Sequence, residues 1–129
     1  MEIEFVEKNI DLHELFNWIE KKFIPENGLK IIDKKIEGNK FSIKVYYPSI
    51  QAVAVLVIEG TSKNFVVSFN LEKMSKFLSM TSYIGIPFGT GPLLLREIRK
   101  KEEFERMERK LSTFLTQIIA ILQNKKRGV

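Results

Sequence analysis

Apolar residues in the last third of the chain recur every three or four positions, and this spacing places side chains on one stripe of an α-helix. The run at 3-4-3-4-3 spacing consists of Phe104, Met107, Leu111, Phe114, Ile118 and Ile121. Pro92 favours a helix start, because a missing N–H costs nothing in a first turn. The pattern predicts one long helix over residues 92–124.

The chain before this helix mostly alternates between apolar and polar residues, as strands do. A first strand is predicted over 2–9 and about five antiparallel strands over about 29–86. Glu37-Gly38-Asn39-Lys40 predicts the tight turn of a β-hairpin. Residues 51–59 are apolar at both parities, which predicts a strand with both faces covered or with a helix on one face. Residues 76–86 are predicted to be a strand, because β-branched and aromatic residues resist helix formation.

A short amphipathic segment follows the first strand. Asp11 is a predicted N-cap, and Glu14 three residues later completes a capping-box pattern. Pro25 and Gly28 are predicted to end the helix. The helix predicted over 11–23 presents apolar residues at helical spacing, namely Leu12, Leu15, Phe16, Ile19 and Phe23.

The order of these elements predicts the fold class. A long amphipathic helix after a block of strands must bury its stripe against the sheet that the strands form. The sequence therefore predicts a single α+β domain over 1–129, with a curved antiparallel sheet around a long C-terminal helix. Strongly curved sheets of this kind tend to enclose a cavity.

Composition narrows the function classes. The chain has no cysteine, which removes disulfides, thiol catalysis and cysteine metal sites. Its start lacks the pattern of a signal peptide, and its apolar stretches are shorter than the ~20 residues of a membrane span. We expect a cytoplasmic protein without integral membrane contact. Abundant lysine, glutamate and isoleucine with little glutamine favour a thermophilic source.

The charge pattern indicates no nucleic-acid partner. The net charge is +5, but lysine and arginine are interleaved with glutamate, and the signs alternate over 96–110 as on a solvated helix face. The basic run Lys125-Lys126-Arg127 lies in a tail that is expected to fray. A nucleic-acid interface would need a clustered basic surface.

Residues with catalytic or metal-binding chemistry are few. His13 is the one histidine, and its place in a first helical turn is typical of a solvated surface rather than of a general base. One histidine without cysteine disfavours zinc. Gly89-Thr90-Gly91 precedes a helix as an anion-binding turn does, but it lacks the Walker lysine, so a plain loop or a gate is favoured. We predict no catalytic residue, no metal and no cofactor.

Two segments carry a family resemblance. Gly91-Pro92-Leu93-Leu94-Leu95-Arg96, the charged stretch after it and the helix from Phe104 to Leu122 resemble the closing helix of the START and Bet v1-like superfamily, which includes polyketide cyclase-like proteins. Glu4-Phe5-Val6-Glu7, followed by Asp11 and Trp18, is similar to its first strand and helix. The resemblance implies a helix-grip fold around a hydrophobic cavity. It carries over no active site, because no polar catalytic set matches.

The predicted function is binding of an apolar, lipid-like small molecule between the sheet and the C-terminal helix. Tyr83 is expected to offer an orienting hydroxyl, and Phe88 lies beside the possible gate. The other predicted lining residues are Phe41, Ile43, Val45, Phe65, Val67 and Phe69 from the sheet and Met107, Leu111 and Phe114 from the helix. A filled aromatic core is equally consistent with these positions.

Two other function classes stay open. One is a homodimer or partner-binding protein that uses the long helix or the apolar strand over 51–59. The other is a cyclase-like enzyme that uses Tyr83 or a buried glutamate as acid or base, which would require a polar group in the cavity with a perturbed pKa.

Overall fold

The computed structural model describes residues 1–72 and 91–127, with side chains described over 1–72 and 98–125. The strand predicted over 76–86, Tyr83 and Phe88 lie outside the described residues. The elements in chain order are β1 (Glu2–Phe5), α1 (Leu12–Trp18), the π-helical turn η1 (Ile19–Phe23), α2 (Ile24–Glu26), β2 (Lys30–Glu37), β3 (Lys40–Tyr47), the 3-10 turn η2 (Pro48–Ile50), β4 (Ala52–Gly60), β5 (Phe65–Leu71) and α4 (Gly91–Arg127).

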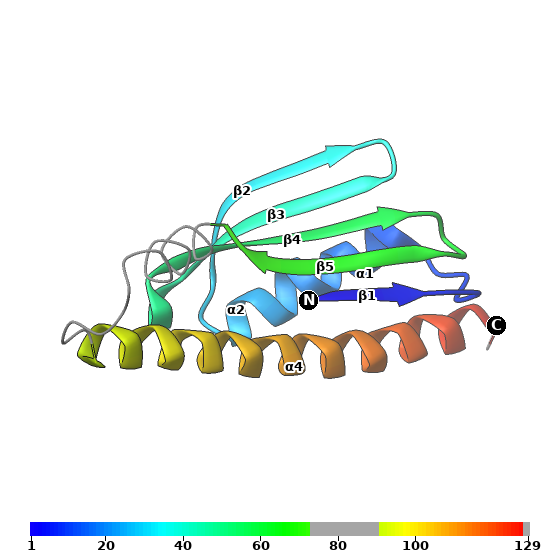
Figure 1. Ribbon diagram of the computed structural model, residues 1–129. Coiled ribbons are helices and arrows are strands. Elements are labelled where there is room, and N and C mark those ends of the chain that lie inside the picture. The colour runs from blue at the N-terminus through cyan, green and yellow to red at the C-terminus, as the bar shows by residue number, and fades with distance from the viewer. Residues whose placement is uncertain (73–90, 128–129) are drawn as a thin grey trace.

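The described strands form one antiparallel sheet of five strands in the order β1-β5-β4-β3-β2. β1 closes back on β5, with Ile3 opposite Val67, so β1 and β2 form the two edges. The long helix α4 runs along the sheet on the side of β1, and the helical segment α1–α2 lies behind the strands (Figure 1). The predicted α+β class, with an antiparallel sheet, a short helix and a long C-terminal helix, is confirmed.

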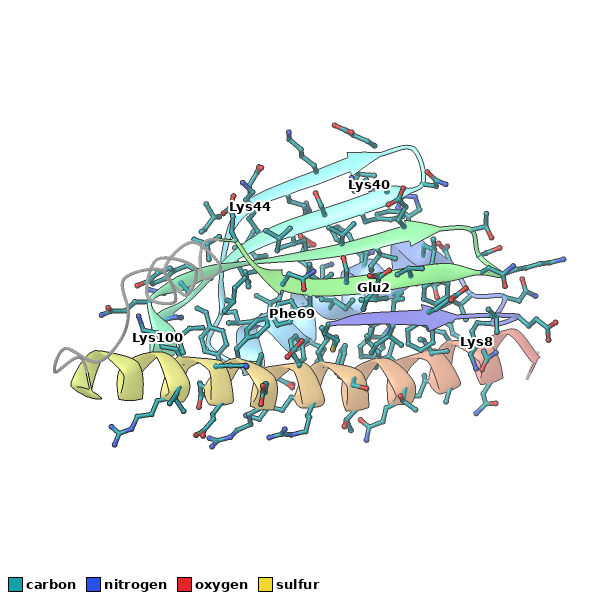
Figure 2. All side chains as sticks on the ribbon, in the orientation of Figure 1. Glu2, Lys8, Lys40, Lys44, Phe69 and Lys100 are labelled. Atoms are coloured by element: carbon teal, nitrogen blue, oxygen red, sulfur yellow. The ribbon has the colours of Figure 1, made fainter. Side chains whose placement is uncertain are left out.

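One face of the sheet carries the core. Alternate residues of β3, β4 and β5 are buried there, and residues of α1–α2 and α4 pack onto the same cluster. Side chains crowd the space between the sheet and α4, with Phe69 among them (Figure 2). The inward sheet residues are Phe41, Ile43, Val45, Tyr47, Ala54, Leu56, Ile58, Phe65, Val67 and Phe69.

The burial of β4 distinguishes between a strand covered on both faces and a strand with helices on one face. Ala54, Leu56 and Ile58 are buried in the core, whereas the valines between them are only half-buried on the opposite face. Among the described residues, helices cover one face of this strand, because α1–α2 and α4 both belong to the same core cluster.

The first strand is shorter than expected, because it ends at Phe5 rather than continuing to residue 9. Glu7 and Asn9 have positive φ values of 54° and 53°, which a strand does not allow. The backbone N–H of Lys8 instead bonds the carbonyl oxygen of Lys63 at 3.0 Å. The chain therefore leaves the sheet edge and turns toward the β4–β5 connection.

The prediction of the short helix over 11–23 is correct at its start and wrong at its end. Asp11 is the N-cap, and its Oδ1 accepts from the His13 N–H at 2.9 Å. Pro25 does not end the helical segment, which continues to Glu26 and stops before Gly28 at φ 69°. A π-helical turn precedes Pro25, so Pro25 falls in the first turn of α2, where the N–H that proline lacks is not needed.

The stripe on α4 rotates along the helix. Ile121, predicted to be on the buried stripe, is 51% exposed, and Phe114 is only half-buried. A strict seven-residue pattern drifts ~20° per heptad on a straight helix, so the buried positions move to neighbouring residues. The buried residues of α4 are Phe104, Met107, Leu111, Leu115, Ile118, Ile119 and Leu122.

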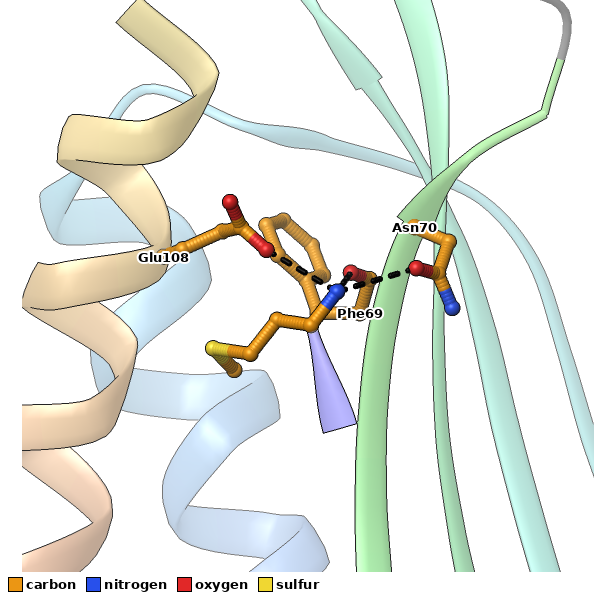
Figure 3. Close-up of polar contacts among 4 residues, drawn as sticks. Phe69, Asn70 and Glu108 are labelled. Carbon is orange, nitrogen blue, oxygen red and sulfur yellow. Dashed lines mark hydrogen bonds and ion pairs between the residues drawn. The ribbon is translucent and has the colours of Figure 1, made fainter. Parts of the chain in front are cut away.

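The start of the described chain is tied to α4. The ammonium of Met1 lies 2.9 Å from a carboxylate oxygen of Glu108 and donates to the carbonyl oxygen of Phe69 at 3.1 Å (Figure 3). It also contacts Oδ1 of Asn70 at 3.0 Å. These contacts join the β1 edge of the sheet to the middle of α4.

Candidate functional site

Nine of the eleven predicted lining residues have described side chains, and eight of the nine lie deep in the core. Phe114 is half-buried beside this core. The eight residues, each 4% exposed or less, are Phe41, Ile43, Val45, Phe65, Val67, Phe69, Met107 and Leu111.

Aromatic rings occupy the space next to several of these residues. Phe69 stacks on Phe104 of α4, with ring centroids 5.0 Å apart. Phe65 stacks on Phe5 at 5.1 Å. Phe41 contacts Phe16 of α1 at 5.3 Å. The described interior is therefore packed around these three predicted lining rings.

Hollows open at the rim of the core. One of about 610 Å³ includes Phe41, and one of about 430 Å³ lies between α2 and α4 and includes Phe114. A third, of about 740 Å³, lies between η2 and the start of the described side chains of α4, with Arg99 and Glu103 in its wall. Of the nine predicted lining residues that the structure describes, Phe41 and Phe114 are the two that line one of these three hollows.

The hollow of about 610 Å³, called the end hollow below, has an apolar floor and a polar rim. Four parts of the chain meet there: the start of α1, the β2–β3 turn, the β4–β5 turn and the last turns of α4. Its lining residues are Ile10, Asp11, Leu12, His13, Glu14, Gly38, Asn39, Phe41, Gly60, Thr61, Ser62, Leu122 and Lys125.

Backbone hydrogen bonds hold the walls of the end hollow together. The Ile10 N–H donates to the carbonyl oxygen of Ser62 at 3.0 Å, and the Gly60 N–H donates to that of Asn39 at 3.2 Å. The side-chain amide of Gln123 on α4 donates to the carbonyl oxygen of Lys8 at 2.8 Å. The wall is thus fixed by contacts between elements far apart in the sequence.

Gly60 is required at this wall by both space and backbone angle. Its φ is 139°, and a Cβ built there would lie 2.5 Å from the carbonyl oxygen of Asn64. An L side chain rarely adopts this angle. The close approach lets β4 turn tightly into β5 beside the hollow.

His13 is exposed, as its helix-surface interpretation predicts, but it also belongs to the end hollow. Its ring meets the ring of Phe41 edge-on, with centroids 4.8 Å apart and planes at 89°. The contact holds the imidazole over the apolar floor. Nothing in the sequence indicated that this histidine, second in α1, would meet a phenylalanine that is second in β3.

A polar contact that the sequence did not predict lies near the other end of the sheet. Tyr47, 1% exposed, has its hydroxyl 3.1 Å from Oε1 of Glu103 on α4. Burial, together with the Glu103 carboxylate, raises the pKa of Tyr47 far above its usual value. The alternation of β3 placed Tyr47 inward, which is the only signal that pointed to it.

Other chemistry finds little support among the described residues. None of their polar or charged side chains other than tyrosine is buried, and no three histidine, aspartate or glutamate side chains lie close enough to hold a metal ion. No helix in the described part of the chain is both long and apolar enough to cross a membrane.

Comparisons of the chain with protein-family models, with curated proteins and with solved structures each return no match.

Proposed function

We propose that this protein binds an amphipathic, lipid-like small molecule in the end hollow. The observation that carries the proposal is a hollow of about 610 Å³ with an apolar floor and polar groups converging on its rim. This volume lies within the ~300–1,000 Å³ range of small-molecule sites, which typically combine an apolar wall with a few orienting polar groups.

The floor supplies the apolar contact. Leu12, Phe41 and Leu122 come from α1, β3 and α4, and each is nearly fully buried except where it faces the hollow. Burying a ligand's apolar surface against them would contribute ~25 cal/mol per Å². An alkyl tail fits this chemistry.

The rim supplies the orientation. Lys125 carries a positive charge, and His13 offers ring nitrogens beside the floor. Thr61 and Ser62 add hydroxyls from the β4–β5 turn. Two carboxylates at the start of α1 belong to the same lining, so an uncharged head group that both donates and accepts hydrogen bonds matches this rim best. The favoured ligand class is therefore a single-tailed amphiphile with a hydroxyl head group.

A helix-grip relationship to the START and Bet v1-like superfamily is part of this proposal. Its support is the strand order, in which β1 pairs with β5 while α1–α2 and α4 pack on one face. The proposed ligand position differs from the expected one between sheet and helix, because rings fill the described middle of the core.

The test is an NMR titration of isotope-labelled protein with 1-hexanol and 1-decanol. 1-Decanol is expected to shift the amide signals of the residues that line the end hollow. Each additional buried methylene should tighten the dissociation constant roughly fourfold, since it contributes ~0.8 kcal/mol.

Two variants separate the site from non-specific binding. Ser62→Trp places a bulky side chain at the rim and should abolish the shifts, whereas Lys63→Trp, exposed one residue further and outside the lining set, should leave them unchanged. Equal loss of the amide shifts in both variants, or a dissociation constant that does not depend on tail length, would contradict the proposal.

A further inference from the structure

The two edges of the sheet are covered differently. β1 is four residues long, and the contacts of Met1 and Lys8 with α4 flank it. β2 is twice as long, and all eight of its residues are exposed. Its isoleucines, Ile31, Ile32 and Ile36, are 43%, 56% and 48% exposed. A long edge with exposed apolar residues is a ready template for another strand.

A bulge sets which side chains of β2 face which way. Ile31 lies opposite Val45 and Asp33 opposite Lys44, so Ile32 is an extra residue on this strand. Paired residues share a face, and the buried residues of β3 mark the core face. Ile31, Lys34 and Ile36 are therefore on the core face of β2, and Lys30, Asp33, Lys35 and Glu37 are on the outer face.

This pattern is complementary to itself in one antiparallel register. With the two-fold axis at Lys34, a second copy of β2 brings together only residues of the same face. The pairs are Lys30 with Glu37, Asp33 with Lys35 and Ile31 with Ile36, each formed twice. Opposite charges directly across a pair of strands are favourable, as are two β-branched side chains.

Lys34 would meet its own symmetry mate, but its charge is already compensated. Its ammonium forms an ion pair of 2.6 Å with Glu20 of the same chain. The like-charge contact on the axis is thereby reduced.

Neighbouring registers are unfavourable. An axis at Asp33 places two aspartates opposite each other and Lys30 opposite Lys35. An axis at Lys35 places two lysines opposite each other and Asp33 opposite Glu37. Like charges directly across are destabilising, and a register shifted by one position would put core-face residues on the outer face. The lysines and the bulge thus disfavour other pairings of this edge.

We propose that two copies of this chain associate edge to edge through β2, antiparallel and centred on Lys34. The two five-stranded sheets then form one continuous sheet, with a small isoleucine cluster on its core face. Such an isologous two-fold contact is the commonest symmetry of homo-oligomers. This inference does not depend on the proposed ligand.

A single introduced cysteine tests the register, because the chain contains no other. Lys34→Cys should form a disulfide-linked dimer under mild oxidation, since directly opposed residues lie ~4.5–5.5 Å apart between Cα atoms, within disulfide range. Lys30→Cys is the matched control, because its copy would lie about 20 Å away along the strands. Equal cross-linking of both variants, or none in either, would overturn the register.

Charge exchange tests the interface without cysteine. Sedimentation should show a dimer for the natural chain at high concentration. Asp33→Lys and Lys35→Asp should each shift it to monomer, and the double variant should restore the dimer. Glu105→Lys on an exposed face of α4 controls for added charge. A monomer at every concentration, or a dimer indifferent to all these changes, would contradict the proposal.

Discussion

The two strands of the β2–β3 hairpin have equal length but differ in burial. β3 buries every second residue, whereas every residue of β2 is exposed. On the same face of the sheet, Ile43 is 0% exposed and Ile36 is 48% exposed. Alternation decides which face a residue occupies, but coverage by helices decides whether that face is buried. Predictions that alter one strand and spare the other test this difference.

The largest expected difference is between two isoleucines on the core face of the hairpin, Ile43 in β3 and Ile36 in β2. Ile43→Ala should lower the free energy of unfolding by ~2–5 kcal/mol, because it leaves a cavity in a packed core. Ile36→Ala at the exposed edge should change it by less than ~0.5 kcal/mol. Urea unfolding of both variants at low protein concentration measures the contrast. Equal losses would mean that the edge of β2 is covered in the single chain.

The two turns beside the end hollow give the next effect. Gly60→Ala should cost ~2–3 kcal/mol, because it combines a disallowed backbone angle with a contact to the Asn64 oxygen. Gly38→Ala in the β2–β3 turn should cost ~1 kcal/mol, since its φ is 57° but nothing lies within 4 Å of the added Cβ. Thermal unfolding of the two variants measures the difference. Similar destabilisation by both would show that the backbone around Gly60 shifts to accommodate the added Cβ.

Tyr47→Phe tests the polar contact between the inner strand and α4. Loss of the hydrogen bond to the Glu103 carboxylate should destabilise the protein by ~1–2 kcal/mol near neutral pH. Because the folded state raises the pKa of Tyr47, the unfolded chain loses this proton first as pH rises.

The stability of the natural chain should therefore be unaffected by Tyr47 ionisation below pH ~10 and fall above it, by up to ~1.36 kcal/mol per pH unit. The gap between the natural chain and Tyr47→Phe should narrow from pH ~9 to ~11. Urea unfolding at both pH values measures it. A constant gap would indicate that the hydroxyl titrates as in the unfolded chain.

The smallest effect concerns the link between β2 and the helical segment. Glu20→Gln removes the 2.6 Å ion pair with Lys34 and should cost at most ~1 kcal/mol. Glu26→Gln removes a looser, more exposed pair with Lys22 at 3.7 Å and should cost nothing measurable. A loss above ~2 kcal/mol for Glu20→Gln would mean that this contact holds β2 on the sheet.

The sequence predicted the class of the fold well, because periodicity reports which face of an element is apolar. The β2–β3 turn, the N-cap at Asp11 and the inward residues of β3 all follow from local pattern. Ile121 was misjudged because a seven-residue pattern drifts around a straight helix. Pro25 was misjudged because a π-helical turn restarts the helix ahead of it.

The site was less predictable, because it depends on how distant segments meet. The end hollow needs the left-handed residues Glu7 and Asn9 to bring α1 to the β4–β5 turn. His13 and Phe41 meet only in the folded chain. The predicted lining residues of β5 were correctly placed inward. The sequence did not show that aromatic rings fill the space beside them, because packing between elements determines whether such a space is filled.

Amide hydrogen exchange tests the contrast between the strands of the hairpin most directly, when measured at low and at high protein concentration. We expect slow exchange along β3 at both concentrations, because its amides are paired with β2 and β4. In β2, the N–H groups that point away from β3 should exchange quickly when dilute and slowly when concentrated, as a second copy covers the edge. Fast exchange of these β2 amides at every concentration would contradict the proposed pairing of β2, and protection already present at high dilution would contradict an uncovered β2 edge in the single chain.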